Sequence, residues 1–380
     1  MTRLLLFANT GWYLYHYRRD LIRTLLEQGW DVIAASPDDE YVESLKSLGI
    51  PWYPVQMTRR GLNPLTEIES YRACYRVFKE LRPTLVHLFT LKSVLYGTLA
   101  ARRLHIPGII NSITGLGYLY SQGSALGRIP QYTLEALLRR AFHDDSVHVI
   151  FQNPDDCEYF DTKGILNPGQ ASVIHSSGVS LTQFPYVHEP SGIPVVLIAA
   201  RMLWDKGIDT AVKAAEILKE RGIPHKLVLA GSPDDGNPAS IPEKTLQMWN
   251  EKENIKWLGH VDEIEKEFAE STVVILPSSY REGVPRSLIE AAATGRPLIA
   301  SDMPGCREIV HENRNGFLIP INDPLELANM LDRLLTDEAL RYKMGIESRR
   351  IVEDQFSSKF VNNATIDVYR SILEKRGMID

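Results

Sequence analysis

The sequence has few cysteines and no long apolar run. Its three cysteines, Cys74, Cys157 and Cys306, are odd in number and far apart, so they predict a reducing compartment and neither a disulfide framework nor a metal site. No apolar segment approaches the roughly 18 residues that span a bilayer. The apolar start at residues 4–7 is too short for the core of a signal peptide. We therefore expect a cytoplasmic protein, either soluble or lying at a membrane surface.

An excess of positive charge is also missing. The 380 residues include 42 Lys and Arg against 48 Asp and Glu, which gives a net charge of −6. The charge is about +1 over residues 1–185 and about −7 over residues 186–380. Proteins that bind nucleic acid show a clustered basic excess, so we expect no nucleic-acid partner.

Short apolar strands alternate with helical patterns along the chain. The first series of strands is expected at residues 4–8, 31–35, 85–89, 108–113 and 148–152, with helices at 18–28, 66–81, 92–104 and 130–142. A second series of strands begins at 195–198 and continues at 226–230, 255–258, 273–276 and 297–300. This alternation predicts an α/β protein with two doubly wound, parallel-sheet (Rossmann-like) domains.

The domain boundary is expected in a stretch rich in proline and glycine, residues 178–194. We expect a first domain at residues 1–182 and a second at 183–355, since 380 residues are enough for two or three domains. The final segment, 356–380, reads as a helix beyond the second sheet.

Two loops carry candidate functional residues. Glu282 and Glu290 lie in a loop and helix start that follow an apolar strand, where free backbone N–H groups suit a phosphate and the carboxylates suit sugar or ribose hydroxyls. Arg201 and Lys206 lie in a similar loop, where they could neutralise a diphosphate. Taken singly, each pattern is also compatible with a chance spacing, a helix-dipole preference for Glu or a solvated basic loop.

Together, the Arg-x4-Lys-Gly of 201–207 and the Glu-x7-Glu of 282–290 resemble the retaining glycosyltransferases of family 4, which have the GT-B fold. Further similar segments extend the resemblance over nearly the whole chain: 177–184, 229–232, 255–261, 300–310 and 315–318.

The resemblance implies two domains that face a cleft, with the sugar-nucleotide donor in the second domain and the acceptor in the first. It implies that the terminal helix crosses back to the first domain. Glu282, Arg201 and Lys206 would be catalytic, and Glu290 would bind the ribose. The implied donor-binding residues are Gly11, Arg201, Lys206, Gly231, Val261, Glu282, Gly283, Val284, Ser287, Leu288 and Glu290.

The sequence contains no Asp-x-Asp, the usual signature of a metal that holds a diphosphate. Arg201 and Lys206 would take the place of the metal, so we expect no metal and no other cofactor. Family membership implies retention of the anomeric configuration by same-face attack, with no separate protein nucleophile.

The first domain departs from the family pattern. A Gly-Gly turn is replaced by residues 9–12 (NTGW), in which Gly11 alone could approach the donor phosphate, and Thr114 stands where many members have a histidine. His87 is more typical of a buried or cleft-lining histidine than of a catalyst. The candidate acceptor-binding residues are Tyr13, His16, Arg59, Arg60, Thr114 and Tyr118.

Residues 114–118 (TGLGY) resemble a narrower group of bacterial enzymes, which extend undecaprenyl-diphosphate-linked sugars in polysaccharide or protein glycosylation. Some of these transfer N-acetylgalactosamine. The resemblance implies a UDP-sugar donor, a lipid-diphosphate-linked sugar acceptor and a place at the inner face of the cell membrane. Aromatic and arginine residues in segment 118–140 could contact an anionic membrane; the alternative is a helix packed on the core, with solvated arginines.

Three alternatives stay open. The acceptor could be soluble rather than lipid-linked, or the chain could be a two-domain sugar-binding protein without catalysis. A nicotinamide oxidoreductase also has doubly wound domains, but the fingerprint begun by Gly115 and Gly117 has Tyr120 where its third glycine should stand.

Overall fold

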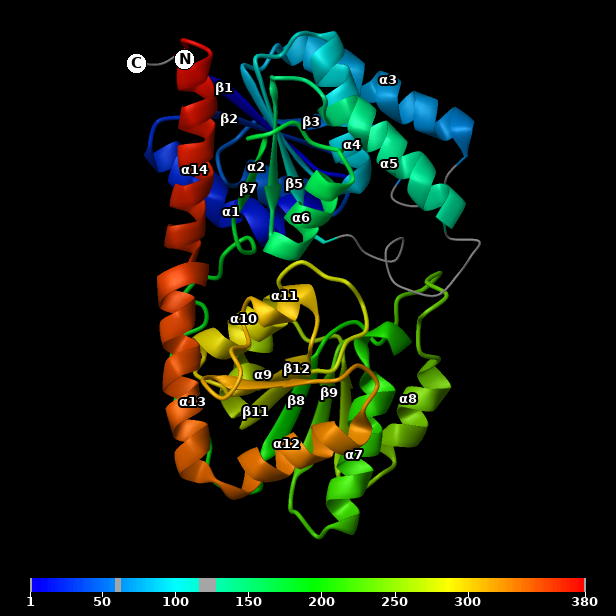
Figure 1. The fold of residues 1–380 in the computed structure, drawn as a ribbon, viewed down its shortest axis with the longest axis vertical. Helices are drawn as coiled ribbons and strands as arrows, with labels where there is room; N and C mark the ends of the chain where they lie inside the picture. Colours follow the sequence, from blue (N-terminus) through cyan, green and yellow to red (C-terminus); the bar gives the residue numbers. More distant parts are fainter. Residues whose placement is uncertain (1, 59–62, 116–127, 379–380) are drawn as a thin grey trace. The chain divides into compact units, whose positions relative to one another are not determined.

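The computed structural model describes residues 2–58, 63–115 and 128–378. The chain divides into two compact units, one formed by residues 1–178 with 358–380 and the other by residues 179–357. Each unit is built around its own parallel sheet with helices on both faces (Figure 1). The chain therefore leaves the first unit near residue 178 and returns to it at residue 358.

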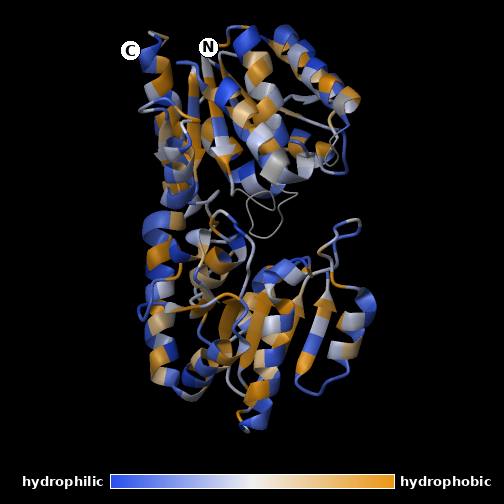
Figure 2. Cartoon of the chain, turned by 45° about the vertical axis from the view of Figure 1, so that its right-hand side comes forward, coloured by the Kyte–Doolittle hydropathy of each residue, from blue (hydrophilic) through white to orange (hydrophobic). Residues whose placement is uncertain are grey.

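The first unit contains a parallel sheet with the strand order β3-β2-β1-β4-β5-β6-β7. Its strands are β1 (Arg3–Phe7), β2 (Asp31–Ser36), β3 (Trp52–Pro54), β4 (Leu85–Phe89), β5 (Gly108–Ile113), β6 (Val147–Phe151) and β7 (Ala171–Val173). Most are continuous apolar runs because both faces of such a sheet are covered. Figure 2 shows this as hydrophobic strands in the middle of each unit.

Helices cover both faces of the first sheet. They are α1 (Gly11–Glu27), α2 (Val42–Lys46), α3 (Pro64–Leu81), α4 (Leu91–Arg103), α5 (Arg128–Phe142), α6 (Pro154–Thr162) and α14 (Ser358–Lys375). Successive strand residues point to opposite faces, and so Leu5 and Phe7 pack with α3, α4, α5 and α6. Leu4 and Leu6 pack with α1, α2 and α14 on the other face.

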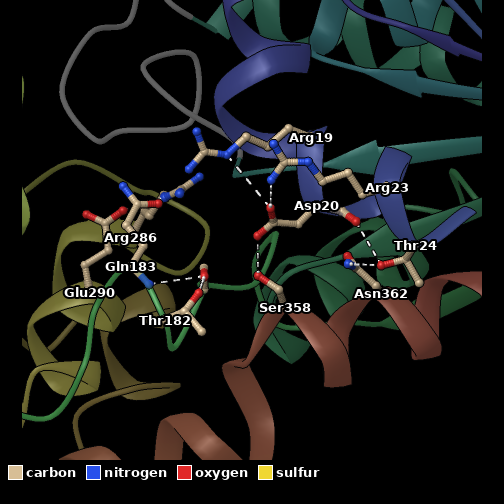
Figure 3. A network of polar contacts seen from close by, with 11 residues as sticks. Arg19, Asp20, Arg23, Thr24, Thr182, Gln183, Arg286, Glu290, Ser358 and Asn362 are labelled. Carbon is tan, nitrogen blue, oxygen red and sulfur yellow. Dashed lines mark hydrogen bonds and ion pairs between the residues drawn. The ribbon is translucent and has the colours of Figure 1, made fainter. Parts of the chain in front are cut away.

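Helix α14 is fixed to the first unit by buried polar contacts. Tyr369 and His87 share a hydrogen bond between the phenol oxygen and Nδ1, while His87 Nε2 lies 2.7 Å from Ser112 Oγ. Burial lowers the pKa of His87 and raises that of Tyr369. Two further bonds tie α14 to α1, Ser358 Oγ to Asp20 at 2.8 Å and Asn362 Nδ2 to Thr24 at 3.1 Å (Figure 3). His87 is thus a fully buried histidine that joins β4 to the last helix.

The second unit has the strand order β10-β9-β8-β11-β12-β13. Its strands are β8 (Val195–Ala199), β9 (Lys226–Ala230), β10 (Ile255–Gly259), β11 (Val273–Leu276), β12 (Leu298–Ser301) and β13 (Gly316–Ile319). Its helices are α7 (Ile208–Glu220), α8 (Glu243–Asn250), α9 (Ile264–Glu270), α10 (Arg286–Ala293), α11 (Pro304–Arg307), α12 (Pro324–Thr336) and α13 (Glu338–Ile351). Short turns, η3 (Trp204–Lys206) and η4 (Val352–Phe356), precede α7 and follow α13.

The two parallel sheets confirm the predicted α/β fold class. The prediction was wrong at the start of α1, which begins at Gly11 and not near residue 18. Thr10 explains the difference because its Oγ1 accepts a hydrogen bond from the N–H of Tyr13 at 3.1 Å and so caps the helix. Within the described residues, the protein has no helix with the length and apolar character needed to cross a bilayer.

Candidate functional site

The candidate site lies at the carboxyl edge of the second sheet, where ligands bind in open parallel sheets. Loops that follow β8, β9, β10 and β11, together with the start of α10, carry the candidate residues of this unit. The predicted Arg201, Lys206, Glu282 and Glu290 all belong to this unit. The structure pairs each of them with an opposite charge.

The loop after β8 is fastened to the loop after β11 through backbone contacts. Asp205 O accepts hydrogen bonds from Ser279 N at 2.9 Å and from Ser278 Oγ at 3.0 Å. Gly207 makes this approach possible, since its φ is +71° and a Cβ there would lie 2.0 Å from Pro277 O. The glycine after Lys206 therefore allows the two loops to pack closely, and this packing fixes the position from which the Lys206 side chain reaches the site.

Lys206 and Glu282 form an ion pair between these two loops, with a hydrogen bond from Nζ to Oε1. The side chains are 10% and 22% exposed. The Tyr280 ring lies 5.4 Å from the ammonium nitrogen, which adds a cation–π contact. An ammonium group has three N–H donors, so Lys206 can keep Glu282 and still donate to a ligand.

Arg201 pairs with Asp234, a residue in the loop after β9 that the sequence analysis missed. Arg201 NH1 lies 2.5 Å from Asp234 Oδ2. Asp234 is itself held, because its N–H donates to Ser240 Oγ at 3.0 Å and its Oδ2 accepts from Asn237 Nδ2 at 3.1 Å. The only sequence signal was a polar, glycine-containing loop directly after a strand, which does not identify a partner 33 residues away.

Glu290 lies in the first turns of α10 and pairs with Arg286, whose Nε is 2.6 Å from Glu290 Oε1. Figure 3 shows the two side chains together on this helix. Glu290 is only 12% exposed, and burial raises the pKa of its carboxyl group while Arg286 opposes the shift. The first N–H groups of a helix have no partner within it, although the N–H of Leu288 donates to Pro285 O at 3.1 Å.

The loop before α10 rests on α11. Val284 and Leu288 are buried in the core of the second unit, together with Cys306 of α11. Gly305 allows the contact because a Cβ there would lie 1.5 Å from Gly283 O. Burial and the nearby Glu282 raise the pKa of the Cys306 thiol, so it stays protonated and is no nucleophile at neutral pH.

The other predicted donor residues lie on different loops and helices. Gly231 follows β9, where its N–H donates to Gly259 O at 2.7 Å and its carbonyl accepts from Trp257 Nε1 at 2.8 Å. Val261 follows β10 and packs against the core. Ser287 belongs to the first turn of α10. Gly11, in the first unit, is the first residue of α1.

The N-terminus of α1 is in contact with a carboxylate that sequence reasoning also missed. Asp39 Oδ2 accepts from Trp12 N at 3.1 Å, and Asp39 Oδ1 accepts from Tyr41 N at 3.1 Å. A helix N-terminus favours a negative group. Asp39 thus supplies the protein's own anion beside Gly11.

The predicted acceptor residues Tyr13 and His16 share an aromatic cluster on α1. The Tyr13 ring stacks on Tyr17 at 5.0 Å, and the His16 ring lies 5.0 Å from Trp12. Thr114 lies elsewhere, after β5, where it lines a small cavity with Ser112 and Leu138. The candidates Arg59, Arg60 and Tyr118 lie outside the described residues.

The described part of segment 118–140 contributes to the core and to a helix end. Leu138 is fully buried. Arg139 donates to the carbonyls of Lys163 and Gly164, at 2.6 and 2.9 Å, at the end of α6. Tyr132 and Leu137 are exposed. The described part of this segment therefore has features of both alternatives. One side packs on the core, and exposed apolar side chains remain that could contact a membrane.

Two protein families match the chain. Residues 3–153 match the family described as Glycosyl transferase 4-like, and residues 182–351 match Glycosyl transferases group 1. The chain is 27% identical over 351 residues to the N,N'-diacetylbacillosaminyl-diphospho-undecaprenol alpha-1,3-N-acetylgalactosaminyltransferase of Campylobacter jejuni, covering 89% of this chain and 90% of that protein. It is 24% identical over 294 residues to the UDP-Gal:alpha-D-GlcNAc-diphosphoundecaprenol alpha-1,3-galactosyltransferase of Escherichia coli, covering 74% of each.

The fold is also similar to solved structures. The sucrose-phosphate synthase of Thermosynechococcus elongatus superposes with a TM-score of 0.82 at 21% identity, over 99% of this chain and 100% of that one. The likeness extends through both parallel-sheet units. With its first unit matching the 4-like family and its second the group 1 family, the chain belongs to the glycosyltransferases and has the GT-B fold.

Proposed function

We propose that this glycosyltransferase moves a hexose or N-acetylhexosamine from a UDP-sugar to an undecaprenyl-diphosphate-linked sugar, with retention of the anomeric configuration. The proposed pathway class is bacterial glycan or protein-glycosylation biosynthesis, at the inner face of the cell membrane. The names of the Campylobacter and Escherichia relatives support the acceptor class, and the second supports a UDP-sugar donor. The observation that carries the proposal is the Lys206–Glu282 pair beside the start of α10.

This pair suits the chemistry of a departing nucleotide diphosphate. Negative charge develops on the leaving oxygen, and preorganised donors that already point at that charge lower the barrier. Lys206 would donate to the diphosphate through N–H groups that Glu282 does not occupy, and α10 would add backbone N–H groups. Glu282 would accept hydrogen bonds from hydroxyls of the donor sugar, and Glu290 would accept them from the ribose.

The candidate cations already have carboxylate partners, so binding of the donor diphosphate would replace or share some of these partners. Arg201 must turn from Asp234 toward the diphosphate or share itself between the two. Lys206 and Arg286 already have carboxylate partners in Glu282 and Glu290. Before the donor binds, the site therefore holds each of these cations beside a carboxylate.

The acceptor would bind the first unit. Tyr13 and His16 offer aromatic surfaces for a sugar, and Thr114 offers a hydroxyl at the end of β5. Arg59, Arg60 and Tyr118 complete the proposed acceptor set.

A panel of donors and acceptors tests the proposal. UDP-N-acetylgalactosamine, UDP-N-acetylglucosamine, UDP-galactose and UDP-glucose are each incubated with a short-chain lipid-diphosphate sugar and with the same sugar free in solution. We expect a mass increase of one sugar only on the lipid-diphosphate acceptor, and an anomeric coupling in the NMR spectrum that matches the donor. Equal transfer to the free sugar would indicate a soluble acceptor. Binding of UDP-sugar with no product on any acceptor would indicate a sugar-binding protein.

We also predict that transfer needs no divalent metal, because Arg201 and Lys206 supply the positive charge that a metal would bring to the diphosphate. Treatment with EDTA followed by gel filtration should leave the rate of UDP release unchanged. A rate that collapses after chelation and returns with Mn²⁺ or Mg²⁺ would show that the two cations do not suffice.

A further inference from the structure

An arginine-lined groove lies on the first unit, outside the proposed donor and acceptor residues. It has a volume of about 870 Å³ and is lined by Arg72, Arg76 and Tyr75 of α3, by Arg103 at the end of α4, and by Gln56 and Glu69. Helix α3 packs on α4, as Figure 1 shows. The three arginines outnumber the one carboxylate, so the groove is locally positive on a protein with negative overall charge.

Two properties of the three arginines leave the positive charge of the groove available to a ligand. Arg72, Arg76 and Arg103 are exposed, and within the described residues none of them forms an ion pair. By contrast, Arg102, next to Arg103, pairs with Asp144 at 3.0 Å. The groove therefore presents cations that the fold does not use.

At the N-terminal end of α3, the same side of the helix carries exposed apolar side chains. Leu65 and Ile68 are 72% and 48% exposed. Residues 65, 68, 72 and 76 are three and four positions apart, and so they share one side of the helix. We call Leu65, Ile68, Arg72 and Arg76 the α3 stripe. An apolar end beside arginines is the arrangement by which a helix lies on a lipid surface, with apolar side chains among the acyl chains and cations at the headgroups.

We propose that the α3 stripe and Arg103 bind the anionic headgroups of a membrane surface, and that this contact brings the first unit to its lipid-linked acceptor. The inference rests on the proposed function. It also places the membrane contact on α3 and α4, whereas the sequence pattern indicated segment 118–140. Charge complementarity selects the occupant. The net charge of −6 repels an anionic bilayer, so attraction must come from a local excess of cations such as the three arginines beside Glu69.

Vesicle binding by the full chain tests the inference. Co-sedimentation with vesicles of phosphatidylglycerol and phosphatidylethanolamine is compared with pure phosphatidylcholine, at low and high salt. We expect binding to the anionic vesicles only, weakened by salt. The variant Arg72→Gln/Arg76→Gln should bind on the order of 10- to 30-fold more weakly, since each basic residue near an anionic leaflet contributes about one kcal/mol.

A matched control is Lys244→Gln/Lys256→Gln in the second unit. Both lysines are exposed and unpaired within the described part of the chain, and the change in net charge is identical. This control should bind vesicles as the unmodified protein does. Equal losses in the two variants would show a general charge effect and overturn the inference, as would an absence of binding at low salt.

Turnover with a soluble, short-chain acceptor separates this inference from the proposed function. The α3 variant should keep the full rate on that acceptor and lose rate only when the acceptor is embedded in anionic vesicles. A lost rate on the short-chain acceptor would place the groove in the acceptor site and contradict a membrane role. If no acceptor is used by any variant while vesicle binding still depends on Arg72 and Arg76, the proposed function fails and the binding surface stands.

Discussion

Lys206→Ala is expected to lower turnover by about 10²-fold or more, the usual cost of removing one preorganised donor at a developing charge. Lys206 Nζ is held by Glu282 and by the Tyr280 ring, so its positive charge is fixed in the site before the donor binds. Removal leaves Glu282 without its partner, and water takes its place. Steady-state kinetics with a UDP-sugar and the short-chain acceptor measure the effect.

Glu282→Ala should show a loss of similar size, and the double variant separates two explanations. If Lys206 only orients Glu282, the double variant will be no worse than either single one. If each contacts the donor, as proposed, the double variant will be slower than both.

A surface lysine on α7 provides the control. Lys213 is exposed and pairs with Asp209 four residues earlier, at 3.0 Å, and such pairs contribute little to stability. Lys213→Ala should therefore keep normal turnover and normal thermal stability. The donor assignment is wrong if Lys206→Ala and Glu282→Ala, with circular dichroism spectra like that of the unmodified protein, also turn over at the normal rate.

Much of the fold could be predicted because both sheets consist of continuous apolar strands separated by helices. Strands such as β4 and β5 were found at their observed bounds. The misses have local causes. β3 and β7 are three residues long and lie at the two edges of the first sheet, which is too short for a pattern to emerge. The early start of α1 was encoded in a single capping residue, Thr10.

The residues of the site were predictable one by one, but their partners were not. Loop positions followed from strand and helix ends, and this led to Lys206 and Glu282 separately. Their ion pair joins positions 76 residues apart and depends on the order of β8 and β11 in the sheet. Asp234 and Asp39 could not be predicted for the same reason. No family motif marks them, and their partners, Arg201 and Trp12, are distant in the sequence.

Gly305→Ala is expected to displace the loop that carries Glu282, because Gly305 of α11 packs directly under that loop. The added Cβ would lie 1.5 Å from Gly283 O and 2.9 Å from Glu282 O. Both are backbone atoms, so no flexible side chain can move away, and the loop that carries Glu282 must shift by an ångström or more. We expect a loss of stability of about 1–3 kcal/mol, as for other overpacked positions. A displacement of this size at a reacting centre can cost about 10²-fold in turnover.

The control for Gly305→Ala is Gly222→Ala at the end of α7. Gly222 has a φ of +72° and nothing within 4 Å of a built Cβ. Alanine there is strained through its backbone alone, at a cost of about 1–3 kcal/mol. The two variants should therefore melt at similarly lowered temperatures, while only Gly305→Ala loses turnover. Equal turnover in the two would mean that the position of the Glu282 loop does not control the rate. A selective loss would tie the rate to the packing of α11 under that loop, because the two variants share the loss of stability and differ only in where the strain falls.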